Sequence, residues 1–254
     1  MKPRGIPLPA VLLDQPGRAP GSLADVTLGQ AFRALLFVAL YLAVLTGGIL
    51  AAGLSGVVDF IPNSAVFVIL CGATAAAMLA LYFHLIRRNS LTLRGLDFRR
   101  FRPRMFHLLW QIPAAIISAA GLQGLVLAGL TQLGMDGTSA GASNDPLASI
   151  VDLPTPLVVL GVLFVAVLTP LWEEVLFRGA FLGGFSQRFR PFAAVVLSAA
   201  LFAACHLLPL TFVYLFALGI ALALLRRFHQ NLWAPVLLHA VNNALVVLIV
   251  MGAS

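Results

Sequence analysis

Long apolar segments constrain the fold of this sequence more than any other feature. A run of about 20 apolar residues is the length that crosses a lipid bilayer as an α-helix. Seven such segments can be marked: Ala34–Leu54, Ala65–Ile86, Leu108–Leu130, Leu157–Gly183, Phe192–Leu208, Thr211–Leu225 and Leu232–Met251. The sequence therefore predicts an all-α, polytopic membrane helix bundle with about seven transmembrane helices.

The composition supports a membrane protein. Of the 254 residues, 61% are hydrophobic and only 10% are charged, whereas soluble proteins carry about 25% charged residues. The formal net charge of +7 would suggest nucleic acid as the partner of a soluble protein. In this chain the positions of the basic residues follow the orientation of the helices in a lipid bilayer, which explains the net positive charge. No nucleic acid partner is therefore predicted.

The basic residues predict which ends of the helices face the cytoplasm. When the N-terminus is placed inside and the segments alternate, all 16 Lys and Arg residues fall toward the cytoplasmic side. The outer connections then contain only acidic charges, at Asp59, Asp136, Asp145 and Asp152. This is the distribution that the positive-inside rule describes. We therefore expect a multi-pass integral membrane protein with a cytoplasmic N-terminus, and the compact chain suggests a bacterial cytoplasmic membrane.

Three of the last four apolar segments contain polar side chains that hydrocarbon excludes. An ionised residue at the membrane centre costs roughly 2.5–3.5 kcal/mol on insertion scales, so such residues face partners and mark functional sites. A spacing of four places two side chains on one helix face, which predicts a pair between Glu174 and Arg178. The polar residues of interest are Glu173, Glu174, Arg178, His206, His239 and Asn243.

These side chains contain the groups that peptide hydrolysis by water requires. A general base must take a proton from the water, and hydrogen-bond donors must stabilise the oxyanion that forms. A carboxylate in a low-dielectric site is a suitable base near neutral pH. Imidazole N–H and asparagine NH₂ groups are suitable oxyanion donors. The pattern therefore favours a hydrolase.

The same residues resemble the three motifs of the CPBP family, which includes type II CAAX prenyl proteases and bacteriocin-processing and immunity (Abi) proteins. The motifs read Glu173-Glu174-x-x-x-Arg178, Phe202-x-x-x-His206 and His239-x-x-x-Asn243, in the family's order and each on an apolar segment. The resemblance covers residues 157–251. Residues 1–130 contain no family motif that we recognise.

The resemblance implies an intramembrane endopeptidase of the glutamate type. In that family's terms, Glu173 and His206 would activate the water, and His239 and Asn243 would stabilise the oxyanion. Glu174 and Arg178 would support the first motif. The implied substrate is a peptide or protein within or at the membrane, either prenylated or a secreted peptide precursor.

The predicted organisation has a tail and one membrane domain. Residues 1–30, with five prolines and no sustained apolar run, are expected to form a flexible cytoplasmic tail. Residues 31–254 form the polytopic domain, with the catalytic core at 157–251. These boundaries place His206 roughly 20 Å and His239 nearer to roughly 10 Å from the inner face, so the helices must tilt for the two to meet.

Other functions remain open from the sequence. Intramembrane Glu, His and Arg side chains also serve proton-coupled transporters, although no inverted repeat is evident. A non-catalytic membrane partner is a further alternative. A metal-independent site without a cofactor is favoured, with zinc as the alternative. Zinc binds Glu and His, but the chain lacks the H-E-x-x-H spacing that chelates it on one helix.

Overall fold

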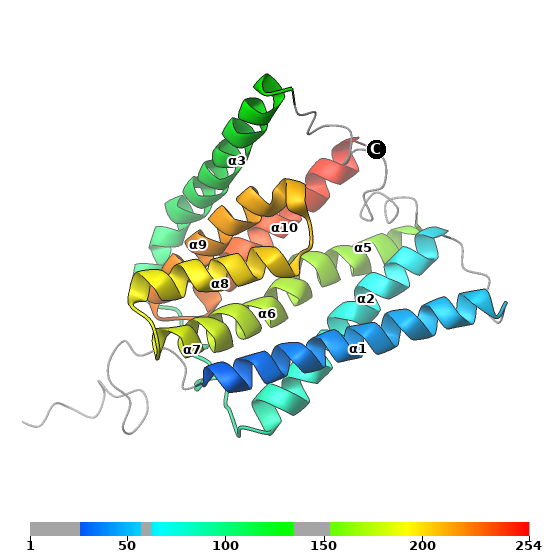
Figure 1. Ribbon diagram of the computed structural model, residues 1–254, viewed down its shortest axis with the longest axis horizontal. Helices are drawn as coiled ribbons and strands as arrows, with labels where there is room; N and C mark the ends of the chain where they lie inside the picture. Colours follow the sequence, from blue (N-terminus) through cyan, green and yellow to red (C-terminus); the bar gives the residue numbers. More distant parts are fainter. Residues whose placement is uncertain (1–25, 57–61, 135–152, 254) are drawn as a thin grey trace, which may run out of the picture.

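The computed structural model describes residues 26–56, 62–134 and 153–253, and in these ranges it contains helices and no strands. The helices lie side by side in one bundle (Figure 1), which confirms the predicted all-α architecture. The α-helices are α1 (Leu28–Leu54), α2 (Pro62–Leu81), α3 (Leu108–Gln132), α5 (Thr155–Leu163), α6 (Thr169–Glu174), α7 (Leu182–Ser186), α8 (Pro191–Cys205), α9 (Phe212–His229) and α10 (Trp233–Ala253).

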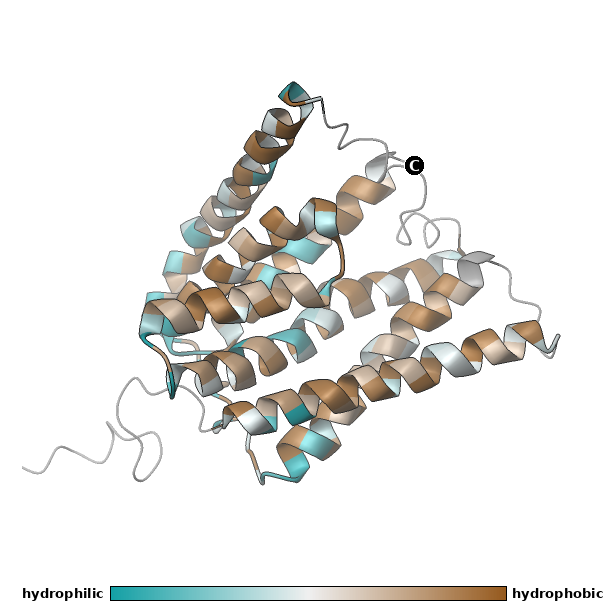
Figure 2. Cartoon of the chain, in the orientation of Figure 1, coloured by the Kyte–Doolittle hydropathy of each residue, from teal (hydrophilic) through white to brown (hydrophobic). Residues whose placement is uncertain are grey.

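Six helical runs are long and apolar enough to cross a membrane, and apolar residues predominate along them (Figure 2). The chain is thus a multi-pass integral membrane protein. The runs are Leu28–Leu54, Ala65–Arg87, Pro103–Gln132, Thr155–Ser186, Pro209–His229 and Trp233–Gly252.

The fifth predicted segment, Phe192–Leu208, is helical but shorter than expected. Helix α8 has 15 residues, which corresponds to about 22 Å against a hydrocarbon thickness of about 30 Å. It ends early because Leu207 adopts a left-handed backbone with φ of 54°. The following Pro209 also disfavours a helical conformation at Leu208.

Helix α1 begins inside the predicted tail. The hydroxyl of Thr27 accepts the N–H of Gln30, and the Gln30 side chain accepts the N–H of Thr27, which is a capping box that starts a helix. Leu28–Gln30 are therefore helical. Residues 1–25 of the tail that was predicted for residues 1–30 lie outside the described residues.

Hydrogen bonds join the predicted cytoplasmic segments at one end of the bundle. The arrangement agrees with helices that alternate in direction along the chain. The bonds are Gln30 to Asn89 (2.7 Å), Gln187 to the Val26 carbonyl (3.1 Å), Arg227 to Ser186 (3.4 Å) and Asn231 to the Arg99 carbonyl (3.1 Å).

Helices α8 and α9 form a close antiparallel pair. A Cβ atom on Gly219 would lie 3.1 Å from the Cα atom of Ala199, which is tighter than an ordinary contact, so a larger residue would require the neighbouring helix to shift. The glycine therefore lets the two backbones approach, and this pair forms one wall of the site described below.

Candidate active site

Glu173 and Glu174 lie on the helical run Thr155–Ser186, here called the site helix, which lies between α1 and α2 on one side and α8 and α9 on the other (Figure 1). The run is not a regular α-helix. Two π-helical segments, Phe164–Leu168 and Val175–Phe181, flank the glutamates. Such wider turns are rare and occur frequently at functional sites.

Pro170 explains one contact of the site helix. In the first π-helical segment the N–H of Thr169 donates to the carbonyl of Phe164, five residues earlier. The next bond in this pattern would join residue 170 to the Val165 carbonyl, but proline has no N–H. Nδ2 of Asn243 donates to this carbonyl instead, at 3.0 Å. Asn243 therefore holds α10 against the site helix.

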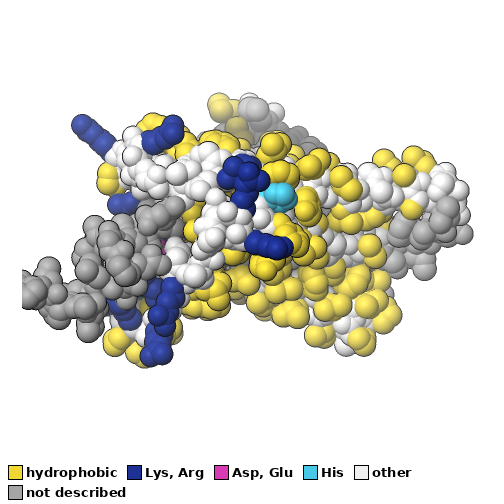
Figure 3. Space-filling model, turned by 90° about the horizontal axis from the view of Figure 1, so that it is seen from below, with side chains coloured by type: hydrophobic (Ala, Val, Ile, Leu, Met, Phe, Trp, Pro, Cys, Tyr) yellow, Lys and Arg dark blue, Asp and Glu magenta, His cyan; other side chains and the backbone are white. Residues whose placement is uncertain are grey.

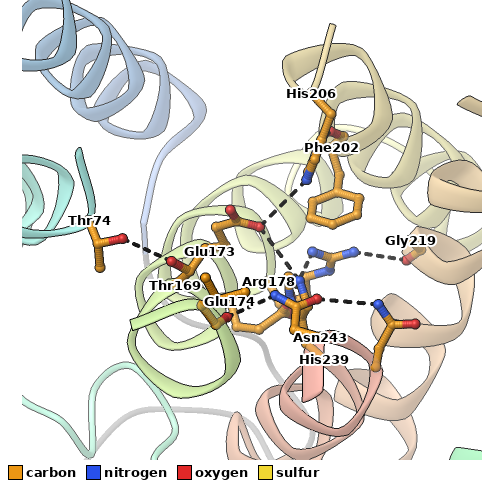
Figure 4. A network of polar contacts seen from close by, with 12 residues as sticks. Thr74, Thr169, Glu173, Glu174, Arg178, Phe202, His206, Gly219, His239 and Asn243 are labelled. Atoms are coloured by element: carbon orange, nitrogen blue, oxygen red, sulfur yellow. Dashed lines mark hydrogen bonds and ion pairs between the residues drawn. The ribbon is translucent and has the colours of Figure 1, made fainter. Parts of the chain in front are cut away.

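Glu174 is completely buried and has two partners on one oxygen. Its Oε1 accepts from Nη1 of Arg178 at 3.0 Å and lies 2.8 Å from Nδ1 of His239 (Figure 4). The predicted pair between Glu174 and Arg178 is thus present. Arg178 also donates to the Gly219 carbonyl at 3.2 Å and lies over the Phe202 ring at 4.3 Å.

Glu173 lies between the two histidines. Its Oε2 is 3.7 Å from Nε2 of His239 and 4.0 Å from Nε2 of His206, and it has no hydrogen-bond partner among the described residues. Both separations exceed a direct hydrogen bond. They are distances at which one water molecule can contact all three groups.

Both imidazole rings are oriented by their other nitrogen. Nδ1 of His206 lies 2.8 Å from the carbonyl of Phe202, which can only accept, so this nitrogen carries a hydrogen. Nδ1 of His239 contacts Glu174, whose ion pair with Arg178 keeps it an acceptor. Each ring therefore presents Nε2 toward Glu173. In histidine sites generally, the hydrogen bond made by one ring nitrogen determines how the other nitrogen is presented.

The site is most exposed at the end of α8. The side chain of His206 is 25% exposed and that of Glu173 is 10% exposed, whereas those of Glu174 and Arg178 are completely buried. Cys205, next to His206, is also exposed. Glu173 and His206 are therefore the charged or titratable members of the cluster that a substrate can reach.

The structure brings together most of the residues that the sequence singled out. Glu173, Glu174, Arg178, His206 and His239 form one cluster of contacts. Asn243 stands beside it, one helical turn from His239. Its Nδ2 donates to the Val165 carbonyl, and its Oδ1 accepts from Nδ2 of Asn242.

Several supporting residues were missed from the sequence. The Tyr214 hydroxyl donates to Oδ1 of Asn242, and Thr74 bonds Thr169 across α2 and the site helix at 2.9 Å. A tyrosine and buried threonines inside apolar segments were the available signal, because intramembrane polar groups seek partners. Nothing in the sequence indicated that the Gly219 carbonyl would accept a hydrogen bond from Arg178.

Among the residues that the structure describes, no group of three or more His, Cys, Asp or Glu side chains has an arrangement suited to a metal ion. Glu173, His206 and His239 come nearest in residue type, since carboxylate and imidazole are zinc ligands. Their contacts to one another are the 3.7 and 4.0 Å separations given above.

The comparisons with known proteins agree with the motifs. Residues 155–245 match the family model described as type II CAAX prenyl endopeptidase Rce1-like. This segment runs from the start of the site helix to just beyond Asn243, and so it contains every predicted site residue. Comparisons with curated proteins and with solved structures found no match. Residues 155–245 are therefore similar to the Rce1-like type II CAAX prenyl endopeptidases.

Proposed function

We propose that this chain is an intramembrane endopeptidase in which Glu173 activates the attacking water. The match of residues 155–245 to the family model of type II CAAX prenyl endopeptidases supports the endopeptidase activity. The observation that carries the glutamate mechanism is the position of Oε2 of Glu173, which is buried, without a hydrogen-bond partner among the described residues, and flanked by two imidazole Nε2 atoms. A base must lie within hydrogen-bond reach of the water that it deprotonates. Oε2 of Glu173 meets this condition for a water molecule bound between the two histidines.

The Glu173 carboxylate and the two imidazoles differ in the protons that they can supply to a bound water molecule. An ionised Glu173 and two neutral rings that carry their hydrogen on Nδ1 are three acceptors facing one water. A water has two protons and can donate to only two of these three acceptors at once. We assign a further proton to Nε2 of His239, which then supplies a donor for the oxyanion.

The reaction then proceeds in two steps. The water oxygen attacks the carbonyl carbon of the peptide while Glu173 accepts a water proton, and the carbonyl oxygen becomes the oxyanion. His239 and the second amide hydrogen of Asn243 donate to that oxyanion, since the first amide hydrogen bonds Val165. The proton held by Glu173 passes to the leaving nitrogen as the C–N bond breaks.

Glu174 and Arg178 act by positioning. Glu174 holds the tautomer and orientation of His239, and Arg178 holds Glu174. Second partners of this kind orient the groups that do the chemistry.

The proposed substrate is a peptide or protein within or at the membrane. Leu207 and Leu208, next to His206, are exposed apolar side chains at the accessible end of the site, which suits an apolar or lipid-modified substrate. Prenylated proteins and secreted peptide precursors are the two classes to test. We also propose, from the positive-inside rule, that the arginine-rich end of the bundle faces the cytoplasm of a bacterial cell.

The test compares protein termini in membranes from cells that produce the wild-type chain or its Glu173→Gln variant at equal abundance. Glutamine keeps the size of the side chain and removes the base. New termini that appear only with the wild type would support the proposal and identify the substrate. Equal cleavage by both chains would show that Glu173 is not the base.

A further inference from the structure

We propose that residues 88–107, here called the arginine loop, form a binding surface for the headgroups of anionic phospholipids. The loop joins the π-helical end of α2, Tyr82–Arg87, to α3. It therefore begins and ends at membrane-spanning helices, which places it at the level of the lipid headgroups. Its role in binding lipid is separate from the proposed proteolysis.

The exposed charge of the described surface is entirely positive. The acidic side chains in the described ranges are Asp97, Glu173 and Glu174, and all three are buried. Arginine side chains project from the end of the bundle that holds the loop (Figure 3). The exposed arginines of the loop are Arg88, Arg94, Arg100, Arg102 and Arg104. Anionic headgroups provide the opposite charge, and each Lys or Arg near such a surface contributes to binding.

Apolar side chains between the arginines favour a lipid over a free anion. Leu93, Phe101 and Phe106 are 66%, 60% and 64% exposed. The rings of Phe101 and Phe106 contact each other edge to face, with centroids 5.9 Å apart. Basic residues bind the phosphate, while large apolar residues beside them enter the acyl region, as in interfacial membrane anchors. A soluble phosphate would use only the arginines.

A buried anchor holds the loop in place. Asp97 is completely buried, has a left-handed backbone with φ of 65°, and bonds both Arg99 and Arg226. Its carbonyl accepts the N–H of Leu232 at 2.9 Å. Asn231 also donates to the Arg99 carbonyl at 3.1 Å. The arginines are therefore presented on an ordered backbone, which lowers the entropy that lipid binding must overcome.

The loop also packs against the site helix. Leu96 is completely buried, and its Cδ2 lies 3.7 Å from the position of a Cβ atom on Gly179, the residue after Arg178. A lipid that holds the loop should therefore stabilise the bundle next to the first motif. If the arginines served only to set orientation, the identity of the headgroup would have no such effect.

The experiment uses the purified full chain in nanodiscs of phosphatidylcholine or phosphatidylglycerol with the same acyl chains and salt. The loop variant is Arg94→Gln/Arg100→Gln, and its matched control is Arg188→Gln/Arg190→Gln, which removes two exposed arginines at the turn between α7 and α8. Native mass spectrometry measures retained lipid, and thermal unfolding measures stability. Neither readout depends on proteolysis.

We expect the wild type to retain phosphatidylglycerol preferentially and to unfold at a higher temperature in it. The loop variant should lose this preference by about fivefold per arginine removed, and the control variant should keep most of it. Equal retention and equal unfolding of the wild type in both lipids would overturn the proposal. So would an equal loss in the control variant, since that would show a dependence on net charge alone.

Discussion

Nδ1 of His239 lies 2.8 Å from Oε1 of Glu174, and Nε2 of the same ring faces Glu173. One imidazole thus connects two adjacent glutamates that have different surroundings. Each carboxylate has one oxygen without a hydrogen-bond partner among the described residues, but Glu174 is completely buried and paired with Arg178, while Glu173 is partly accessible. The doublet therefore divides into a positioning carboxylate and a carboxylate available for chemistry.

This division predicts that one substitution at His239 has different effects on folding and on cleavage. The amide nitrogen of asparagine replaces Nδ1 of histidine, so His239→Asn should keep the contact with Glu174 and remain stably folded. It lacks any group at the Nε2 position, and we expect cleavage to be lost. Thermal unfolding and the appearance of product termini check the two expectations. Cleavage that persists in His239→Asn would contradict a role for Nε2.

Glu174→Leu should destabilise the protein strongly. The change leaves the buried guanidinium of Arg178 without its carboxylate, and breaking a buried pair in this way costs roughly 3–5 kcal/mol. The double variant Glu174→Leu/Arg178→Met should recover most of the lost stability, because an apolar replacement of both partners is often tolerated. Equal unfolding temperatures for the single and double variants would show that the pair is not coupled. Glu173→Gln is the neighbouring control and should unfold close to the wild type.

Gly219→Ala should separate α8 from α9. The added Cβ would lie 3.1 Å from atoms of Ala199, and overpacking of this kind costs about 1–3 kcal/mol. The shift would also move the Gly219 carbonyl away from Arg178. The control is Gly121→Ala on α3, where a Cβ meets nothing within 4 Å. A lower unfolding temperature for the first variant alone is the expected result.

Asp97→Asn should release the arginine loop. Arg226 is completely buried and would lose the negative charge that it contacts. We expect trypsin to cleave the loop faster in the variant, and the unfolding temperature to fall. Trypsin cleavage at the wild-type rate would show that Asp97 does not anchor the loop.

Cleavage should survive strong chelators. A water activated by Glu173 and the histidines needs no metal ion, whereas a zinc site would lose its ion and its activity. The assay measures product termini after chelation and after added zinc. Activity that disappears with the chelator and returns with zinc would replace the glutamate mechanism with the metal alternative.

The site residues could be predicted from the sequence because charge inside apolar segments is rare. Glu173, Arg178 and His206 stand out against uninterrupted hydrophobic neighbours. Spacing of four along a helix was sufficient to pair Glu174 with Arg178. By contrast, the role of the Gly219 carbonyl depends on how closely two helices approach, and no local pattern encodes that separation.

The positions of the site residues along the membrane normal could not be predicted from the sequence. Counting residues from the predicted boundaries separated His206 and His239, yet both contact Glu173. The arginine loop also contacts the start of α10, because the Asp97 carbonyl accepts the N–H of Leu232. This contact follows from tertiary packing around the buried Asp97 side chain rather than from hydropathy.

The 15 residues of α8 also have a consequence for the surrounding lipid. A helix about 22 Å long is shorter than the hydrocarbon region of a bilayer, so the acyl chains beyond its end have no apolar protein surface to contact. The leaflet must compress around the turn, so this chain creates a thin patch of membrane beside His206, the more exposed of the two site histidines. The rate of the proposed cleavage should then vary with the acyl-chain length of the host membrane. Thick bilayers would oppose the deformation, and thin bilayers would accommodate it.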